Sequence, residues 1–426
     1  MRLDLLLFAR DWAKRAAKRL FSRNQRMRGL LRRLDAFVCR MMAPGVGGST
    51  AGRAMDAGGI YGVNVAGYFT GDFGVAEGAR ADVRALEAAG VPYVRIRIDT
   101  PGRWDEGAAG IDFSSENPYR YNLIHVNAEQ AHDFYRRSGR GLFAGRFNIG
   151  YWVWELSQFP EDFAGAFQYY DEIWTPSAFS ADAISRLSTK PVVRMPHAVS
   201  IEGGAPARGR FGLSDDEFIF LFAFDFYSIF ERKNPLAAVA AFKSAFGDDP
   251  RFRLVIKHLH ADNFPNDFEI LKRRAVGKNV TLMGGRLTRA EFVSLMASCD
   301  SYVSLHRSEG FGLTIAEAMA MGKPVIATDY SGSADFMNAD NGFPVRYRLV
   351  ELKKGLPPYL KGGVWAEPDA GHAAELMRLV SEDRGLAGTR GKKAEEHIRL
   401  HLSPSAVGGL YKGRLDWLER HMGRAV

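Results

Sequence analysis

Cysteine is almost absent from this chain of 426 residues, which contains only Cys39 and Cys299. Two cysteines so far apart cannot form a disulfide framework, and they provide no metal-ligand spacing. We therefore expect a protein of a reducing, cytoplasmic compartment.

Long apolar runs are also missing. Residues 3–9 are apolar but interrupted by Asp4, and they are much shorter than the roughly 18 to 20 residues of a membrane span. No small-residue cleavage site follows them. The sequence therefore predicts neither a signal peptide nor a transmembrane helix.

An excess of charge of one sign is missing from most of the chain. The net charge is +8, but residues 1–40 hold twelve Lys and Arg side chains against three Asp, so the remainder is close to neutral. A protein that grips nucleic acid with its folded surface would carry its basic residues there. We therefore expect no nucleic-acid partner.

The basic N-terminus, residues 1–45, contains apolar side chains between its arginines, which predicts a helical arm. Such an arm can lie on an anionic membrane surface, for example on the inner membrane face, or it can be a solvated or partner-packed extension. Both interpretations remain open. The glycine-rich residues 44–49 predict a flexible linker after it.

The length of the chain predicts two domains. Residues 60–65 favour a strand, residues 75–89 a helix that ends at Gly90, and residues 93–98 a second strand, which makes a β-α-β unit. Further strands are predicted at residues 121–126, 147–153, 172–174 and 192–195. Because strands alternate with helices, residues 56–204 are expected to form a Rossmann-like domain with a parallel sheet.

The same alternation of predicted strands and helices begins again after residue 204. Strands are predicted at residues 218–223, 254–256, 280–283, 301–305 and 325–328. We expect residues 205–390 to form a second Rossmann-like domain and residues 391–426 to form helices that cross back to the first. Since parallel sheets bind ligands beyond the carboxyl ends of their strands, two facing sheets predict an interdomain cleft as the site.

The densest motif follows the strand at 301–305. Gly310 and Gly312 permit close backbone approach, and the amides of Leu313 and Thr314 at the start of a helix form an anion site suited to a diphosphate. Glu309 precedes this helix, Phe311 lies between the glycines, and Glu317 lies near the middle of the helix. Because carboxylates accept hydrogen bonds from vicinal hydroxyls, one acid can hold a sugar and the other a ribose.

Glu309 and Glu317, with seven residues between them around a Gly-Phe-Gly loop, resemble the motif of the family-4 retaining glycosyltransferases. The resemblance implies an α/β protein of GT-B fold, with an acceptor domain followed by a donor domain. It implies that a nucleotide-diphosphate sugar is the donor, with its ribose on Glu317 and the transferred sugar on Glu309. Residues 151–156 and 171–177 also resemble this family, especially its bacterial polysaccharide and O-antigen mannosyltransferases, which favours a GDP-mannose donor and a role in lipopolysaccharide or other cell-surface polysaccharide synthesis.

A second match to this family follows the strand at 218–223. The resemblance implies that basic residues there hold the donor diphosphate, a role suited to Lys233 and to Arg232. The Gly-Arg pair usual in the family is replaced by the segment 224–227, which contains Phe224, Phe226 and Tyr227, so the identity of the second cation stays open.

In the first domain, the resemblance places His125 near the sugar and the acceptor, although a lone histidine is also commonly structural. We predict that His125, Lys233 and Glu309 form the catalytic set. Gly71, Gly74 and Glu155 are expected on the acceptor side.

An Asp-x-Asp triplet, the usual ligand set for a metal-bound diphosphate, does not occur in the sequence. We therefore predict a metal-independent enzyme without a cofactor, which transfers a hexosyl group with retained configuration to a saccharide or lipid-linked saccharide acceptor. Two alternatives remain: a nucleotide-sugar isomerase or hydrolase on the same fold, and a non-catalytic saccharide-binding scaffold.

Overall fold

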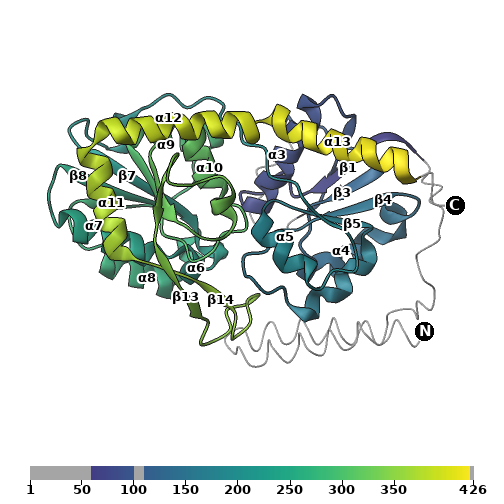
Figure 1. Ribbon diagram of the computed structural model, residues 1–426, viewed down its shortest axis with the longest axis horizontal. Helices are drawn as coiled ribbons and strands as arrows, with labels where there is room; N and C mark the ends of the chain where they lie inside the picture. The colour runs from purple at the N-terminus through teal and green to yellow at the C-terminus, as the bar shows by residue number, and fades with distance from the viewer. Residues whose placement is uncertain (1–58, 100–109, 423–426) are drawn as a thin grey trace. The chain divides into compact units, whose positions relative to one another are not determined.

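The computed structural model describes residues 59–99 and 110–422 (Figure 1). The predicted basic arm, residues 1–45, lies outside these ranges. In the described part of the chain, the helices are too short or too polar to cross a bilayer. Both large sheets belong to one compact unit.

The first sheet contains six parallel strands in the order β2-β1-β3-β4-β5-β6. Its strands are β1 (Ile60–Gly67), β2 (Tyr93–Arg97), β3 (Tyr119–Ile124), β4 (Phe147–Tyr151), β5 (Glu172–Thr175) and β6 (Val192–Arg194). The connecting helices are α3 (Gly74–Ala88), α4 (Ala128–Phe143), the 3-10 helix η1 (Glu161–Tyr169) and α5 (Ala178–Ser185). The predicted β-α-β unit is therefore confirmed, with Gly90 at φ 64° after α3.

The second sheet also contains six parallel strands, in the order β12-β11-β10-β7-β8-β9. The strands are β7 (Phe218–Asp225), β8 (Phe252–Leu259), β9 (Val280–Met283), β10 (Ser301–Ser304), β11 (Val325–Thr328) and β12 (Phe343–Val345). The helices are α6 (Phe230–Lys233), α7 (Pro235–Phe246), α8 (Pro265–Arg274), α9 (Arg289–Ser298), α10 (Leu313–Ala320), α11 (Ala370–Glu382), α12 (Arg384–His401) and α13 (Pro404–Met422). Short 3-10 helices are η2 (Arg208–Phe211), η3 (Phe226–Ser228), η4 (Ala261–Asn263) and η5 (Ser331–Asp335).

The strand β7 shows why an unbroken apolar run forms the centre of this sheet. Phe218, Phe220 and Phe222 pack into one apolar cluster, whereas Ile219 and Leu221 pack into another. Because successive side chains of a strand point to opposite faces, both faces of the sheet must be covered. The predicted parallel α/β architecture follows from this pattern and is confirmed.

The C-terminal helices pack through glycine contacts. In α12, a Cβ at Gly391 would collide with the carbonyl oxygen of Gly322, next to α10. The next helix, α13, lies beside α3 of the first sheet (Figure 1). A Cβ at Gly408 there would collide with the carbonyl oxygen of Ala85. Glycine therefore allows each pair of backbones to approach closely.

An antiparallel hairpin, β13 (Tyr347–Glu351) with β14 (Val364–Pro368), was not predicted from the sequence. Its inner side chains Leu352, Tyr359 and Trp365 join an apolar cluster formed mostly by residues of the first domain. The segment lacks a long apolar run and contains the exposed residues Arg348, Lys353 and Lys361, so its sequence pattern gave no strand signal.

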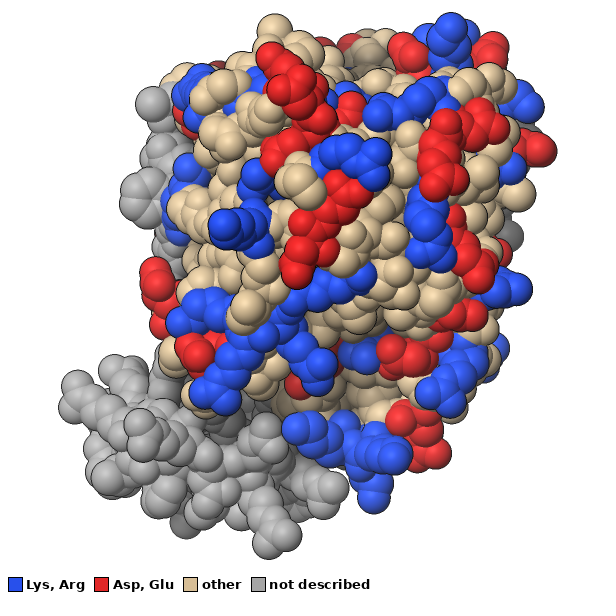
Figure 2. Space-filling view, turned by 90° about the vertical axis from the view of Figure 1, so that its left-hand side faces the viewer, with Lys and Arg blue, Asp and Glu red and all other residues tan. Residues whose placement is uncertain are grey.

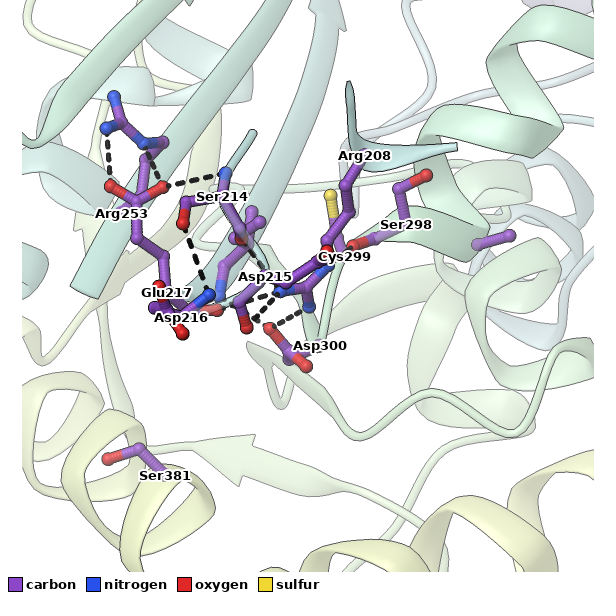
Figure 3. Close-up of polar contacts among 12 residues, drawn as sticks. Arg208, Ser214, Asp215, Asp216, Glu217, Arg253, Ser298, Cys299, Asp300 and Ser381 are labelled. Carbon is purple, nitrogen blue, oxygen red and sulfur yellow. Dashed lines mark hydrogen bonds and ion pairs between the residues drawn. The ribbon is translucent and has the colours of Figure 1, made fainter. Parts of the chain in front are cut away.

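Arg208 fixes the start of the second domain, as Figure 3 shows. Its guanidinium donates to the carbonyl oxygens of Ser298 and Glu217, both at 3.0 Å, and to Asp300 Oδ2 at 2.8 Å. Glu217 and Asp300 directly precede β7 and β10. This polar cluster therefore ties together the amino ends of two central strands, at the sheet edge opposite to the predicted site.

The surface of the second-sheet side carries both signs of charge. Figure 2 shows Lys and Arg side chains interspersed with Asp and Glu over this face. Such mixing differs from the single basic field that binding to a phosphate backbone favours.

Candidate active site

The candidate site is built on the carboxyl ends of β7 and β10, which are neighbours in the second sheet. The chain leaves β7 through η3 and α6, which ends at Lys233. It leaves β10 through a loop that carries Glu309 and continues into α10. Since parallel strands end at the same edge, residues 76 positions apart in the sequence meet there.

Two left-handed residues shape α6. Ile229 has φ 65° and Asn234 has φ 55°, so the helix is short and turns sharply at both ends. The side-chain amide of Asn234 donates to the carbonyl oxygen of Leu305 at 3.0 Å, and the backbone N–H of Arg307 donates to the carbonyl oxygen of Arg232 at 2.8 Å. A β-branched residue at positive φ is costly, and such strain is frequent at functional sites.

Glu309 is buried, with 8% exposure, between two cations. Lys233 Nζ lies 2.5 Å from Oε1 of Glu309, and Arg232 Nη1 lies 3.1 Å from Oε2 of Glu309. Burial by itself would raise the pKa of Glu309, but the charges of Lys233 and Arg232 outweigh it and lower the pKa to about 2. The acid is therefore an ionised, doubly paired carboxylate.

Arg232 is buried behind Glu309. The same Nη1 donates to the carbonyl oxygen of Ser308 at 2.9 Å, and Nη2 lies 4.0 Å from Oε1 of Glu155. Arg232 thus contacts three protein groups: the carboxylates of Glu309 and Glu155 and the backbone carbonyl of Ser308. Lys233 is also largely buried, and this burial lowers its pKa in spite of the nearby Glu309.

The two glycines of the motif have different tasks. Gly312 has φ 97° and precedes α10, whose N-terminal cap makes no side-chain hydrogen bond. At Gly310 a Cβ would collide with Val153 of the first domain. The absence of a side chain at Gly310 therefore permits the close contact between the loop of the second domain and Val153 of the first domain.

The first turn of α10 contains Leu313 and Thr314, both partly exposed. Thr314 Oγ1 accepts a hydrogen bond from the buried Tyr302 hydroxyl at 2.8 Å. Phe311 is buried, and its ring contacts His197 of the first domain edge-on. The helix start is consequently anchored by its neighbours, while its N–H groups point along the helix axis as an anion site requires.

Glu317 is buried on α10 and pairs with a residue that the sequence analysis missed. Arg289 Nη2 lies 2.7 Å from its Oε1, and the Arg289 side chain is 42% exposed. Burial raises the pKa of Glu317, against the effect of Arg289. The sequence signal that was available is the capping box of Thr288 and Glu291, which places Arg289 in the first turn of α9.

Glu155 lies in the loop after β4 of the first domain, and it contacts the site residues of the second domain. Its backbone carbonyl accepts a hydrogen bond from the Ser308 hydroxyl, and its carboxyl Oε1 lies 4.0 Å from Arg232 Nη2. Burial raises its pKa. Glu155, Arg232, Lys233 and Glu309 therefore form one cluster with contributions from both domains.

His125 lies in a different buried group. Its ring is 1% exposed, stacks on Tyr151, and has Nε2 3.1 Å from Oδ2 of Asp82. His197 also stacks on Tyr151 and connects this group to Phe311. His125 was predicted near the sugar and the acceptor, but its ring is enclosed by Asp82 and Tyr151. Its catalytic role stays a prediction.

The glycine loop before α3 contacts the second domain through Asp72. Arg286 Nη2 lies 3.2 Å from Asp72 Oδ2. Gly71 is buried next to the ring of Phe73, whereas Gly74 is exposed and begins α3 with open space around it. Their predicted role on the acceptor side stays a prediction.

Comparison with known proteins finds a family match within the second domain. Residues 207–397 match the family model described as "Glycosyl transferases group 1". The match covers less than half of the chain, and it includes Arg232, Lys233, Glu309 and Glu317. Among curated proteins, none matches the chain in sequence.

Solved structures share the fold of nearly the whole chain. HepE from Anabaena, in complex with UDP and glucose, has a TM-score of 0.59 and 14% identity over 84% of this chain and 100% of its own. Sucrose-phosphate synthase from Thermosynechococcus elongatus has a TM-score of 0.63 and 16% identity over 85% and 100%. A glycosyltransferase from Rickettsia africae has a TM-score of 0.59 and 14% identity over 85% and 99%. At these identities the likeness shows the fold, which is the expected GT-B fold.

Proposed function

We propose that this GT-B protein, whose residues 207–397 match the group 1 glycosyltransferases, transfers a hexosyl group from a nucleotide-diphosphate sugar to a saccharide or lipid-linked saccharide. The observation that carries the proposal is the position of Glu309 and Glu317. Glu309 directly precedes the glycine loop of α10, Glu317 lies on the helix, and Lys233 reaches Glu309.

The donor is proposed to lie along the start of α10. The transferred sugar would contact Glu309, the ribose would contact Glu317, and the diphosphate between them would meet the N–H groups of Leu313 and Thr314. Lys233 now pairs with Glu309, so a bound diphosphate would share this cation. A helix N-terminus together with a lysine is a suitable combination for phosphate oxygens.

In the proposed reaction, the bond between the anomeric carbon and the diphosphate oxygen breaks, and a bond to the acceptor hydroxyl forms on the same face. The departing diphosphate accepts the proton of that hydroxyl, and the configuration is retained. Helix amides and Lys233 stabilise the charge that develops on the leaving group. Replacing Lys233 by Ala is expected to lower kcat/KM about a hundred- to a thousandfold, which corresponds to roughly 3 to 4 kcal/mol.

The donor base is the first property to test. GDP-mannose is our proposed donor, and the UDP and glucose in the HepE complex make UDP-glucose the second choice. A thermal-shift panel of UDP, GDP and ADP should show stabilisation by one nucleotide in the wild type and loss of it in Glu317→Ala. Equal stabilisation of wild type and variant by all three nucleotides would contradict the assigned ribose site.

Metal independence and retention have separate tests. Turnover should survive excess chelator, and the product should keep the anomeric configuration of the donor. Abolition by chelator, or an inverted product, would refute the respective claim. Sugar release without any acceptor would indicate a hydrolase instead. The acceptor is proposed to be a growing cell-surface polysaccharide, to be identified by transfer from the preferred donor to isolated lipid-linked saccharides.

A further inference from the structure

Tyr302 is a buried tyrosine on β10, a strand that lies inside the second sheet between β11 and β7. It is 1% exposed, and a phenolic hydroxyl at such a depth needs a hydrogen-bond partner. Its hydroxyl oxygen lies 2.8 Å from Thr314 Oγ1 and 3.5 Å from the carbonyl oxygen of Ala223. Because a hydroxyl has one proton, the much shorter distance identifies Thr314 as the acceptor.

This hydrogen bond lies near the sheet edge that carries the candidate site. Tyr302 pairs with Leu221 of β7, and Ala223 lies two residues closer to the carboxyl end of that strand. The tyrosine side chain therefore reaches toward the carboxyl end of the sheet. Thr314 lies in the first turn of α10, directly after Gly312 and Leu313. Its hydroxyl is consequently close to the helix N–H groups that are proposed to meet the diphosphate.

The direction of the hydrogen bond decides what Thr314 can do. A threonine in a helix commonly donates its hydroxyl proton to a backbone carbonyl one turn earlier. Among the described residues, no backbone carbonyl accepts the hydroxyl proton of Thr314. Burial raises the pKa of Tyr302 well above its ordinary value, so the phenol keeps its proton and stays a donor. Since Thr314 Oγ1 accepts that proton, the proton of Thr314 can be donated to a further acceptor.

We propose that the Thr314 hydroxyl donates a hydrogen bond to a phosphate oxygen of the sugar donor, and that Tyr302 is the positioning residue that fixes this hydroxyl as a donor. This inference rests on the proposed function and adds a side-chain contact to the backbone amides of α10. Thr314 is partly exposed, so a ligand can reach it. A hydrogen bond to an ionised phosphate oxygen is stronger than one between neutral groups, which favours this acceptor.

The experiment compares ligands that differ only in their phosphates. Calorimetry on the full-length protein measures the affinities for GDP and guanosine and, in parallel, for UDP and uridine. Thr314→Val keeps the shape of the side chain and removes the hydroxyl, so the affinity for the diphosphate that the wild type binds should fall roughly ten- to a hundredfold. The affinity for the matching nucleoside should stay unchanged, because a nucleoside has no phosphate. Thr314→Ser keeps the hydroxyl and should bind the diphosphate nearly as the wild type does.

A double-mutant cycle tests the role of Tyr302. Tyr302→Phe keeps the ring and removes the proton donated to Thr314, so diphosphate binding should weaken roughly three- to tenfold while nucleoside binding stays unchanged. In the Thr314→Val background the same change should have no further effect on the affinity, because the hydroxyl on which it acts is absent. The kcat/KM for the sugar donor should follow the same pattern.

Tyr121→Phe is the matched control, because Tyr121 is a buried tyrosine on β3 of the first sheet, whose hydroxyl donates to Glu419 Oε1 at 2.7 Å. It should lower the unfolding temperature and leave the diphosphate affinity unchanged. Wild-type affinity of Thr314→Val, equal losses for diphosphate and nucleoside, or additive losses in the cycle would overturn the inference while the proposed function stands. A wild type that binds neither diphosphate would sink the proposed function, and this inference with it.

Discussion

Glu309 and Glu317 are both buried acids, but their surroundings act on them in opposite directions. Glu309 has two cations within 3.1 Å, which overcome the cost of burial. Glu317 has one, Arg289, whose guanidinium is partly in water, and burial dominates. The difference follows from the number and exposure of the partners, since a charge that is solvated pairs more weakly.

Replacing Glu309 by Gln should destabilise the fold in a pH-dependent way. The pKa is about 2 in the folded protein against an ordinary value of 4.5, so the carboxylate contributes stability above pH 4.5 that is lost as the pH falls toward 2. The difference in unfolding free energy between wild type and Glu309→Gln should be roughly 3 kcal/mol at pH 7. Denaturant unfolding at pH 7, 5 and 3 should show it shrinking.

Glu269→Gln is the control for this series, because Glu269 pairs with Lys272 and Arg273 on the exposed side of α8. It should unfold at nearly the wild-type denaturant concentration at every pH. A pH-independent loss in Glu309→Gln would mean that the ion pairs do not stabilise the carboxylate.

Replacing Arg289 by Ala should weaken nucleotide binding most at low pH. Removal of the guanidinium takes away the charge that lowers the pKa of Glu317, so the pKa should rise further and the carboxylate should be protonated at higher pH than in the wild type. Affinity measured by calorimetry over a pH series should therefore begin to fall at a higher pH in Arg289→Ala than in the wild type. Arg273→Ala, on α8, is the control. If wild type and Arg289→Ala had parallel pH dependences, Glu317 would not be the ribose acceptor.

At the scale of elements, close helix packing depends on single glycines. In α13 two glycines are adjacent, but only Gly408 faces α3, where a Cβ would meet the carbonyl oxygen of Ala85. Around Gly409 there is open space. Both lie inside one helix, so the same substitution at each separates packing from helix propensity.

Gly408→Ala should therefore destabilise the protein by about 1 to 3 kcal/mol, because the added methyl overpacks the contact between α13 and α3. Gly409→Ala should stabilise it by up to about 1 kcal/mol, since alanine favours the helix and meets no neighbour. Thermal unfolding of the two variants should move in opposite directions. Equal shifts would show that α13 does not pack closely on α3.

Most strands of the two large sheets were predictable because each forms a short apolar run between turn residues, whereas β12 (Phe343–Val345) was not predicted. The strand β9 was predicted at residues 280–283 and β11 at residues 325–328, and both have these bounds. The hairpin was not predictable. Its strands are recognisable only from what they pack against, since Val350 and Trp365 cover the first domain while Tyr347 and Leu349 are exposed.

At the scale of the whole molecule, the two sheets are joined by more than the chain between them. The α13 helix returns to the first sheet, the hairpin enters its apolar cluster, and Asp335 accepts a hydrogen bond from the backbone N–H of Ala178 at 2.8 Å. The site lies where these two domains meet, so its residues depend on the contact between domains.

The membrane interpretation of residues 1–45, one of the two left open by the sequence, is tested at this scale. Deletion of these residues should abolish binding to anionic vesicles, since each Lys or Arg near such a surface contributes about 1 kcal/mol. Turnover on a soluble acceptor should be unchanged. Cosedimentation with anionic and with zwitterionic vesicles measures this, and unchanged binding after the deletion would reject the membrane role of the arm.

The sequence by itself determined the parallel sheets and placed two acids around a glycine loop at the end of a strand, because periodicity and loop chemistry are local properties. Only the tertiary structure decided the partners of those acids. Arg289 reaches Glu317, and Arg232 and Lys233 reach Glu309, across distances in the sequence that no local pattern spans. Whether a carboxylate is charged depends on these neighbours, and their positions follow from how the sheets, the hairpin and the last helix pack together.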